Sequence, residues 1–198
     1  MARALALAAA LAVSLLAVSG AGGAVTQTPK RGGTLVIGTR TADEPPCLNV
    51  FADACSFPPP LLDQILPGAF EVRPDATLWP DLADAEIVAK QPFTLRYRIR
   101  PEARWSDGVT VSAQDFAFTW RMHRKYQPGT PESEQVRSAR ALDAKTFRVV
   151  LRTRNPDWRL LFPIILPQHA LAGESFESLW ASAIDNPKTR RAIGSGPF

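Results

Sequence analysis

The chain has 198 residues, 45% of them hydrophobic, and its 23 lysine and arginine side chains stand against 19 aspartates and glutamates. This mild positive charge does not argue for a nucleic acid or another polyanion, so no nucleic acid partner is expected, and the apolar content is that of a protein with a folded core. The sequence contains neither GxSxG nor HExxH, and its glycine pairs lack the Lys-Ser/Thr of a phosphate-binding loop. We therefore expect a protein that is not an enzyme and that holds no metal and no cofactor.

Residues 1–24 predict a secretory signal peptide. Arg3 precedes a run of Ala, Leu, Val and one Ser over residues 4–18, and Gly22 and Ala24 suit the cleavage positions of a signal peptidase. The run is short for a membrane span, which favours a signal peptide. An uncleaved anchor is the alternative. No cysteine lies near the expected cut. We expect export across the cytoplasmic membrane to the periplasm or cell surface, without a lipoprotein cysteine.

Cys47 and Cys55 are the only cysteines of the chain. Because an exported protein meets an oxidising compartment, they are expected to form a disulfide, whose short loop would stabilise the fold by about 2–3 kcal/mol. Free thiols and a metal site are the alternatives. A metal would need more ligands, and the histidines that remain, His123 and His169, are far away in sequence and are expected to be surface or hydrogen-bonded residues.

Short elements are expected before residue 90. Residues 34–38 are apolar on both faces, which is typical of a strand covered from both sides. A short helix that begins behind a proline cluster is expected over residues 61–66. The expected strands that follow cover residues 69–73, 78–81 and 85–88, the last as antiparallel partner of the next segment.

Residues 93–100 alternate strictly between apolar and polar side chains, which predicts a strand with one buried face and one face in water. Pro101 ends this strand, because proline cannot donate a hydrogen bond to a neighbouring strand. The arginines of the polar face are interpreted as a solvated surface. The buried face is predicted to hold Phe93, Leu95, Tyr97 and Ile99, and the exposed face Thr94, Arg96, Arg98 and Arg100.

A turn and a capped helix follow the strand. The Trp-Ser-Asp-Gly sequence at residues 105–108 predicts a tight turn. Ser112 is expected to be the N-cap of a helix over residues 113–126, with Asp115 in the place that glutamate takes in a capping box. Asp107 and Asp115 resemble an acid pair of a catalytic site, but their turn and cap positions explain both.

The second half of the chain predicts another hairpin, with strands over residues 136–142 and 146–152. A short helix is expected to begin at residues 155–157 and to include apolar residues 160–162. A last helix is expected over about residues 176–184.

The motif order resembles family 5 of the extracellular solute-binding proteins of bacterial ABC importers, a group that includes dipeptide, oligopeptide and nickel receptors. Val50 departs from the pattern, since family members usually have proline there. The motifs that carry the resemblance are Gly32-Gly33-Thr34-Leu35, Glu44-Pro45-Pro46-Cys47-Leu48-Asn49, Trp105-Ser106-Asp107-Gly108 through Ser112, Ala113, Asp115 and Phe116, Leu142-Asp143-Ala144-Lys145-Thr146, and Gly194-Ser195-Gly196-Pro197-Phe198.

The resemblance implies a mixed α/β (α+β) fold, the periplasmic-binding-protein-like fold of type II, with an incomplete first lobe and its extra subdomain. Residues 25–198 would be the N-terminal part of the family domain, with the second lobe absent, so the chain is interpreted as a fragment, from a truncated gene model or an incomplete sequence. In this scheme a first-lobe strand covers residues 33–40, the extra subdomain about 58–185, and the return to the first lobe 193–198.

The implied function is that of a monomeric receptor that captures a peptide or similar small solute between two lobes and delivers it to the permease and ATPase of an importer. By resemblance, Ala54, Cys55, Ser56 and Phe57 line the ligand cleft, where their backbone would pair with an extended peptide. The alternative is that Cys55 is tied to Cys47 and this loop only packs. The loop at residues 165–167 is a weaker candidate.

Three other functions stay open. The first is the same fold with a different ligand: a nickel chelate, haem, an oligosaccharide or a signalling peptide. The second is a secreted enzyme whose active site lies in the missing part. The third is a non-functional remnant.

Overall fold

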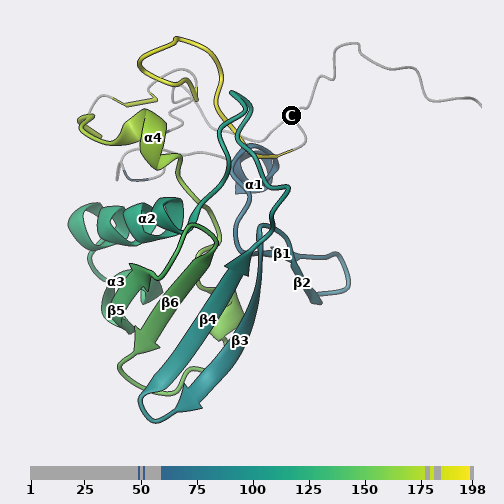
Figure 1. Ribbon diagram of the computed structural model, residues 1–198, viewed down its shortest axis with the longest axis vertical. Helices are drawn as coiled ribbons and strands as arrows, with labels where there is room; N and C mark the ends of the chain where they lie inside the picture. The colour runs from purple at the N-terminus through teal and green to yellow at the C-terminus, as the bar shows by residue number, and fades with distance from the viewer. Residues whose placement is uncertain (1–48, 50, 52–58, 177–178, 181–183, 197–198) are drawn as a thin grey trace, which may run out of the picture. The chain divides into compact units, whose positions relative to one another are not determined.

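The computed structural model describes residues 49, 51, 59–176, 179–180 and 184–196, all of which belong to one compact unit (Figure 1). The expected signal peptide, the expected strand over residues 33–40, both cysteines and the candidate ligand residues 54–57 lie outside the described residues, as does Pro197. None of the described helices is long and apolar enough to cross a membrane.

A four-stranded antiparallel sheet forms the centre of this unit. Both hairpins predicted from the sequence are present, and pairing of the second strand with the fourth joins them. The partner strand expected over residues 85–88 is longer than predicted. The strands are β3 (Ala83–Lys90), β4 (Phe93–Ile99), β5 (Val136–Ala141) and β6 (Thr146–Leu151), in the order β3-β4-β6-β5.

The alternating pattern of β4 separates a buried face of the sheet from an open face, as predicted. Leu95 and Tyr97 are fully buried on one face. On the other, Arg96 and Arg98 both pair with Glu86 of the neighbouring strand, at N–O distances of 3.4 and 2.9 Å. The arginines therefore follow the predicted solvated surface, with one carboxylate shared between two of them.

Thr94 is the exception to the predicted pattern. It was expected on the exposed face, but only 1% of its surface is accessible. Its hydroxyl donates a hydrogen bond to the carbonyl of Pro92 at 2.8 Å, inside the turn that connects β3 and β4. The expectation of exposure was wrong here, and the bond back to Pro92 is a local contact that alternation does not report.

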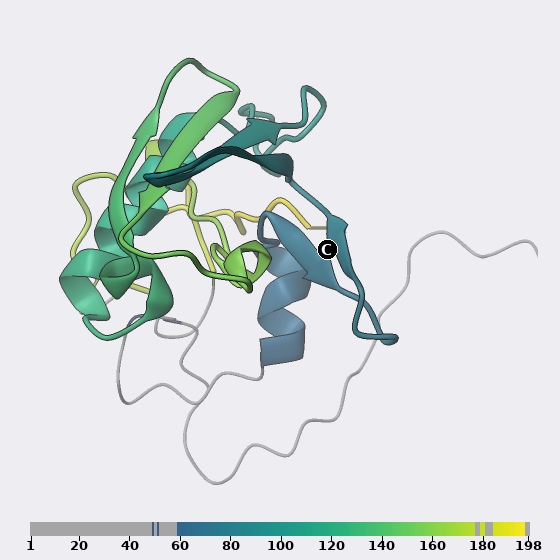
Figure 2. The same cartoon turned by 90° about the horizontal axis from the view of Figure 1, so that it is seen from below.

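The helix α2 (Ala113–Tyr126) covers the buried face of the sheet, and its bounds match the prediction (Figure 2). Where they meet, four aromatic rings form a cluster with centroid separations of 5.4 to 6.3 Å, in the tilted and edge-on arrangements that aromatic rings prefer. Helix and sheet thus share one apolar core. The cluster consists of Tyr97, Phe116, Phe147 and Phe162.

The remaining elements are short and surround this core. The predicted helix after the proline cluster, the two short strands after it and the helical turn near residue 160 are all present. α3 and α4 were not predicted. The elements are α1 (Pro59–Ile65), the ribbon of β1 (Phe70–Val72) and β2 (Leu78–Pro80), α3 (Pro131–Glu134), the 3-10 helix η1 (Trp158–Leu160) and α4 (Gln168–Leu171).

The helix predicted over about residues 176–184 is wrong. Phe176, Leu179 and Trp180 lie in turns, and Trp180 has a φ angle of +56°, which an α-helix does not tolerate. The apolar side chains of this segment that the structure describes, Phe176, Leu179, Trp180 and Ile184, are buried without forming a helix.

Candidate functional site

The Trp-Ser-Asp-Gly motif forms the tight turn that the sequence predicts. The backbone N–H of Trp105 donates to the carbonyl of Val109 at 2.7 Å, and that of Gly108 donates to the carbonyl of Trp105 at 2.8 Å. Gly108 has a φ angle of +88°, where a side chain would be strained. One carboxylate oxygen of Asp107 accepts the N–H of Val109 at 3.1 Å and completes the turn.

Asp115 is the residue on which the turn and two helices converge. Its carboxylate accepts the backbone N–H of Ser112 at 2.8 Å, which completes the predicted cap of α2, and also the Ser112 hydroxyl at 3.1 Å. It further accepts the N–H of Gln168, the first residue of α4, at 2.8 Å and the indole N–H of Trp105 at 3.4 Å. Burial raises the pKa of Asp115, and these hydrogen bonds oppose that effect.

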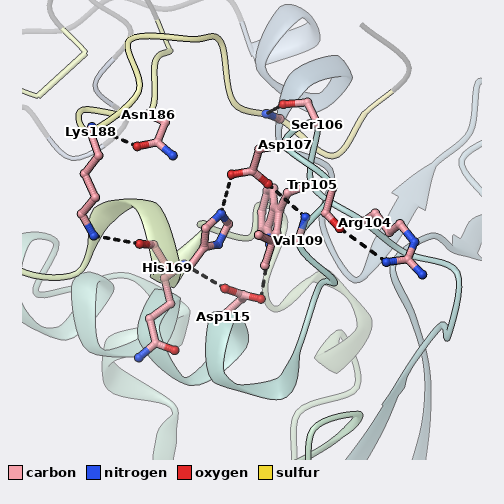
Figure 3. A network of polar contacts seen from close by, with 12 residues as sticks. Arg104, Trp105, Ser106, Asp107, Val109, Asp115, His169, Asn186 and Lys188 are labelled. Atoms are coloured by element: carbon pink, nitrogen blue, oxygen red, sulfur yellow. Dashed lines mark hydrogen bonds and ion pairs between the residues drawn. The ribbon is translucent and has the colours of Figure 1, made fainter.

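Asp107 also reaches α4, through its second carboxylate oxygen (Figure 3). This oxygen lies 2.7 Å from Nε2 of His169. Burial of Asp107 opposes its ionisation, but the hydrogen bonds from His169 and Val109 outweigh burial and hold the pKa of Asp107 below its usual value. The motif turn is therefore bound to α4 by two aspartates, one buried and one at the surface.

Ser106 connects the same turn to the C-terminal segment. Its backbone N–H donates to the carbonyl of Gly194 at 2.7 Å, and its hydroxyl donates to the carbonyl of Ala192 at 3.0 Å. The N–H of Gly194 returns a hydrogen bond to that hydroxyl at 3.2 Å. The ammonium group of Lys188 donates to the carbonyl of His169 at 3.0 Å, so the C-terminal segment is also tied to α4.

The Gly-Ser-Gly sequence at residues 194–196 is required by its contact with α1. The backbone N–H groups of Ser195 and Gly196 donate to the carbonyl of Ile65, the last residue of α1, at 2.9 and 3.2 Å. Helix C-termini leave such carbonyls without intrahelical partners. A Cβ on Gly194 would lie 2.6 Å from the Ile65 carbonyl oxygen, and one on Gly196 only 1.8 Å from that of Gln64. Only glycine permits this approach.

We call this meeting of the motif turn, α4, the C-terminal segment and the start of α2 the motif junction. A hollow of about 610 Å³ opens beside it. In the described part of the chain, no group of three His, Cys, Asp or Glu residues has the arrangement of a metal site. Nδ1 of His169 is buried and has no hydrogen-bond partner among the described residues. The hollow is lined by Ser106, Asp107, Asn186, Thr189, Arg191, Ala192 and Ile193.

The structure therefore brings most of the sequence-derived motif residues together, in structural roles. The weaker candidate ligand loop is not available: Ile165 and Leu166 are fully buried, and their N–H groups donate to Pro67 and Thr119. The contact of His169 with Asp107 was not predicted from the sequence, because 62 positions separate the two residues and no local pattern links them. The motif residues of the junction are Trp105, Asp107, Gly108, Ser112, Asp115, Gly194 and Gly196.

Comparison with known families gives this junction its context. The model of the bacterial extracellular solute-binding proteins, family 5 (middle region), matches residues 77–198, which is more than half of the chain. The chain belongs to this family. The match includes every motif residue of the junction.

Two relatives illustrate how much of a family 5 protein the chain represents. It is 34% identical over 118 residues to the probable monoacyl phosphatidylinositol tetramannoside-binding protein LpqW of Mycobacterium tuberculosis, covering 53% of this chain and 18% of the relative. It is 25% identical over 175 residues to the dipeptide-binding protein DppE of Bacillus subtilis, covering 72% of this chain and 31% of the relative. The chain thus spans less than a third of either.

Solved structures confirm the expected fold, the mixed α/β fold of type II periplasmic binding proteins, over part of those proteins. The oligopeptide-binding protein AppA of Bacillus subtilis, in complex with a nonapeptide, matches with a TM-score of 0.63 at 17% identity over 80% of this chain and 32% of its own. A mannohexaose-bound oligopeptide-binding protein of Thermotoga maritima matches with a TM-score of 0.55 at 26% identity over 67% and 25%, respectively.

Proposed function

We propose that this protein is the extracytoplasmic receptor of an ABC importer, which captures peptides or similar small solutes and delivers them to a membrane permease. The observation that carries the proposal is the family 5 match over residues 77–198. The receptor performs no chemistry: the ligand is trapped between two lobes by hinge closure, and the permease recognises the closed form.

A peptide is the ligand that we propose first. Among the similar proteins, DppE is named for dipeptides, and AppA and the OppA protein of Listeria monocytogenes were crystallised with peptides. The backbone of residues 54–57 would line the cleft, and an extended peptide would pair with it as an added strand. The motif junction holds the subdomain together and stays away from the ligand.

A mannose-containing glycolipid or oligosaccharide is the second candidate ligand. LpqW, at 34% identity, is named for a tetramannoside lipid, and the Thermotoga maritima protein was crystallised with mannohexaose. These similarities favour a carbohydrate over the nickel chelate of another neighbour, a Campylobacter jejuni protein that is 23% identical.

The ligand class is tested with the full-length protein in a thermal-shift screen. Dipeptide and oligopeptide pools, mannohexaose, nickel-histidine and a mannosylated phosphatidylinositol are compared. A ligand at a hundred times its Kd stabilises the folded state by about 2.7 kcal/mol, which raises the midpoint measurably. A saturable shift with peptides supports the first candidate. A shift with mannosides alone supports the second, and no shift with any member contradicts both.

Export is part of the same proposal and has its own test. We propose that the mature receptor is a monomer that begins at Val25 and carries a disulfide between Cys47 and Cys55. The intact mass of the secreted protein, with and without reduction, reports the start of the chain and the disulfide. A mass that includes residues 1–24 contradicts cleavage, and two titratable thiols in the oxidised protein contradict the disulfide.

A further inference from the structure

A second hollow lies at the end of the sheet where β3 turns into β4. Figure 1 shows this turn at the lower end of the sheet. The pairing of β4 with β6 ends at Thr94 and Val150, and residues on either side of this end line the hollow. The hollow measures about 680 Å³, within the range of ordinary small-molecule sites. Its lining consists of Ile87, Lys90, Gln91, Pro92, Phe93, Arg152, Thr153 and Arg154.

The charge of this lining is of one sign. Lys90, Arg152 and Arg154 are its three ionisable residues, and no carboxylate contributes to it. Arg152 is fixed in place, because its Nε donates to the carbonyl of Glu134 at 2.9 Å. Within the described part of the chain, neither Lys90 nor Arg154 forms an ion pair. The hollow therefore holds uncompensated positive charge.

Three other residues of the lining are apolar. Ile87 is 45% exposed, an unusual state for an isoleucine that faces the same side of the sheet as the core. Pro92 and Phe93 adjoin it in the lining. An exposed apolar side chain beside unpaired cations matches a ligand that combines an anionic group with a hydrocarbon part.

The open face of the sheet does not offer the same combination. Its arginines lie along the strands, and Arg96 and Arg98 already share the carboxylate of Glu86. The lining of the hollow combines unpaired cations with an exposed apolar side chain.

We propose that this hollow binds a small amphipathic oxyanion, a phosphate or carboxylate attached to a short hydrocarbon chain. Arginine and lysine side chains recognise both oxyanions, with arginine suited to two-point contact. Lys90 and Arg154 hold the anionic group, and Ile87 contacts the hydrocarbon. The lining contains no residue of the motif junction, so the proposed site is distinct from that junction.

The test measures binding of octyl phosphate, octanoate, octanol and inorganic phosphate to the full-length protein by calorimetry. We expect saturable binding of octyl phosphate or octanoate at least tenfold tighter than that of inorganic phosphate or octanol. The double variant Lys90→Gln/Arg154→Gln weakens this binding about tenfold. Ile87→Ser weakens the binding of the octyl compounds and leaves the binding of inorganic phosphate unchanged. Raising the salt concentration weakens binding to the unmodified protein, because the charges are exposed.

The matched control is Arg140→Gln/Arg148→Gln, which removes two arginines of the open face. These residues lie opposite each other on β5 and β6 and do not line the hollow. A change below twofold is expected for this control. Three results would overturn the proposal: no saturable binding of either octyl anion, equal weakening by the control, or binding that survives the Lys90/Arg154 double variant. Binding that survives the double variant would also assign the ligand to another site, such as the solute cleft.

Discussion

Nε2 of His169 lies 2.7 Å from Oδ2 of Asp107, across 62 positions of sequence. Asp107 belongs to the motif turn before α2, and His169 to α4. The pair is about a quarter exposed on each side, so solvent weakens the interaction without abolishing it. It is the surface counterpart of the buried contact between Asp115 and Gln168.

This pair predicts an acid-dependent loss of stability. The pKa of Asp107 is lower in the folded protein than in the unfolded chain, so its stabilising contribution is present above the unfolded value of about 3.9 and is lost as the pH falls further. Asp107→Asn should cost about 1 kcal/mol at pH 7 and remove part of the loss below about pH 4. Urea unfolding between pH 3 and 7 measures both effects.

The control separates the histidine contact from the turn. His169→Gln removes the histidine and leaves the hydrogen bond between Asp107 and Val109 intact, and the double variant completes a cycle. A coupling free energy of at least about 0.5 kcal/mol at pH 7 is expected for a direct contact. A coupling of zero would contradict the contact.

The close approach of the C-terminal segment to α1 predicts a large effect of one methyl group. In Gly196→Ala the new Cβ would lie 1.8 Å from the Gln64 carbonyl oxygen, so the segment must move away from the end of α1. We expect a loss of about 3 kcal/mol in the free energy of unfolding, at the upper end for overpacking.

Gly108→Ala is the matched control for this substitution. Gly108 has a φ angle of +88° and no atom within 4 Å of an added Cβ, so only backbone strain opposes the change. Strain of this kind costs about 1–2 kcal/mol. Chemical unfolding of both variants should rank Gly196→Ala as the more destabilised. The reverse order would show that conformational strain outweighs the contact with α1.

Local signals made much of this fold predictable. The bounds of α2 follow from Ser112 and Asp115, which lie beside the helix they cap, and β4 follows from alternation within seven residues. Pairing of β4 with β6 was not predicted, because it joins two hairpins separated by a helix. The helix expected around Trp180 is wrong, because this residue is buried in a turn with a φ angle of +56°.

The motif junction was only half predictable. Turn and cap roles of Asp107 and Asp115 could be derived from neighbouring residues. Their contacts with His169 and Gln168 could not, because α4 is only four residues long and has no periodicity to detect. The ligand residues proposed at 54–57 stay a prediction, since they lie outside the described residues.

Tyr97 predicts a substitution that does not destabilise. Its hydroxyl is fully buried in the aromatic cluster and has no hydrogen-bond partner among the described residues. Burial and the charge of Glu132 both raise its pKa, so the phenol stays neutral at all ordinary pH values. Because an unpaired buried hydroxyl is unfavourable, Tyr97→Phe should leave the free energy of unfolding unchanged or raise it by about 1 kcal/mol.

Phe147→Leu in the same cluster is the comparison for Tyr97→Phe. It removes ring contacts with Tyr97, Phe116 and Phe162 and should destabilise by about 1–3 kcal/mol. Urea unfolding of the two variants measures the difference. A loss above about 1 kcal/mol in Tyr97→Phe would mean that the hydroxyl has a partner, such as a buried water.

Asp115 predicts the opposite pH dependence to Asp107. Burial raises its pKa in the folded protein, so its ionisation destabilises the fold as the pH rises from the unfolded value of about 3.9 through the folded value. Asp115→Asn removes this pH dependence. It also places an amide NH₂ against the N–H of Gln168 or of Ser112, both of which donate to the carboxylate at 2.8 Å.

The lost acceptor should dominate, because an unsatisfied buried donor costs about 1–3 kcal/mol. We therefore expect Asp115→Asn to lower the free energy of unfolding by that amount at pH 7, and by more at pH 4, where the unmodified protein bears less of the cost of the buried charge. Ser112→Ala, which removes one donor to the same carboxylate, should cost less, about 1 kcal/mol. Denaturant unfolding at the two pH values distinguishes the variants, and a smaller loss at pH 4 than at pH 7 would refute the assigned direction of the pKa.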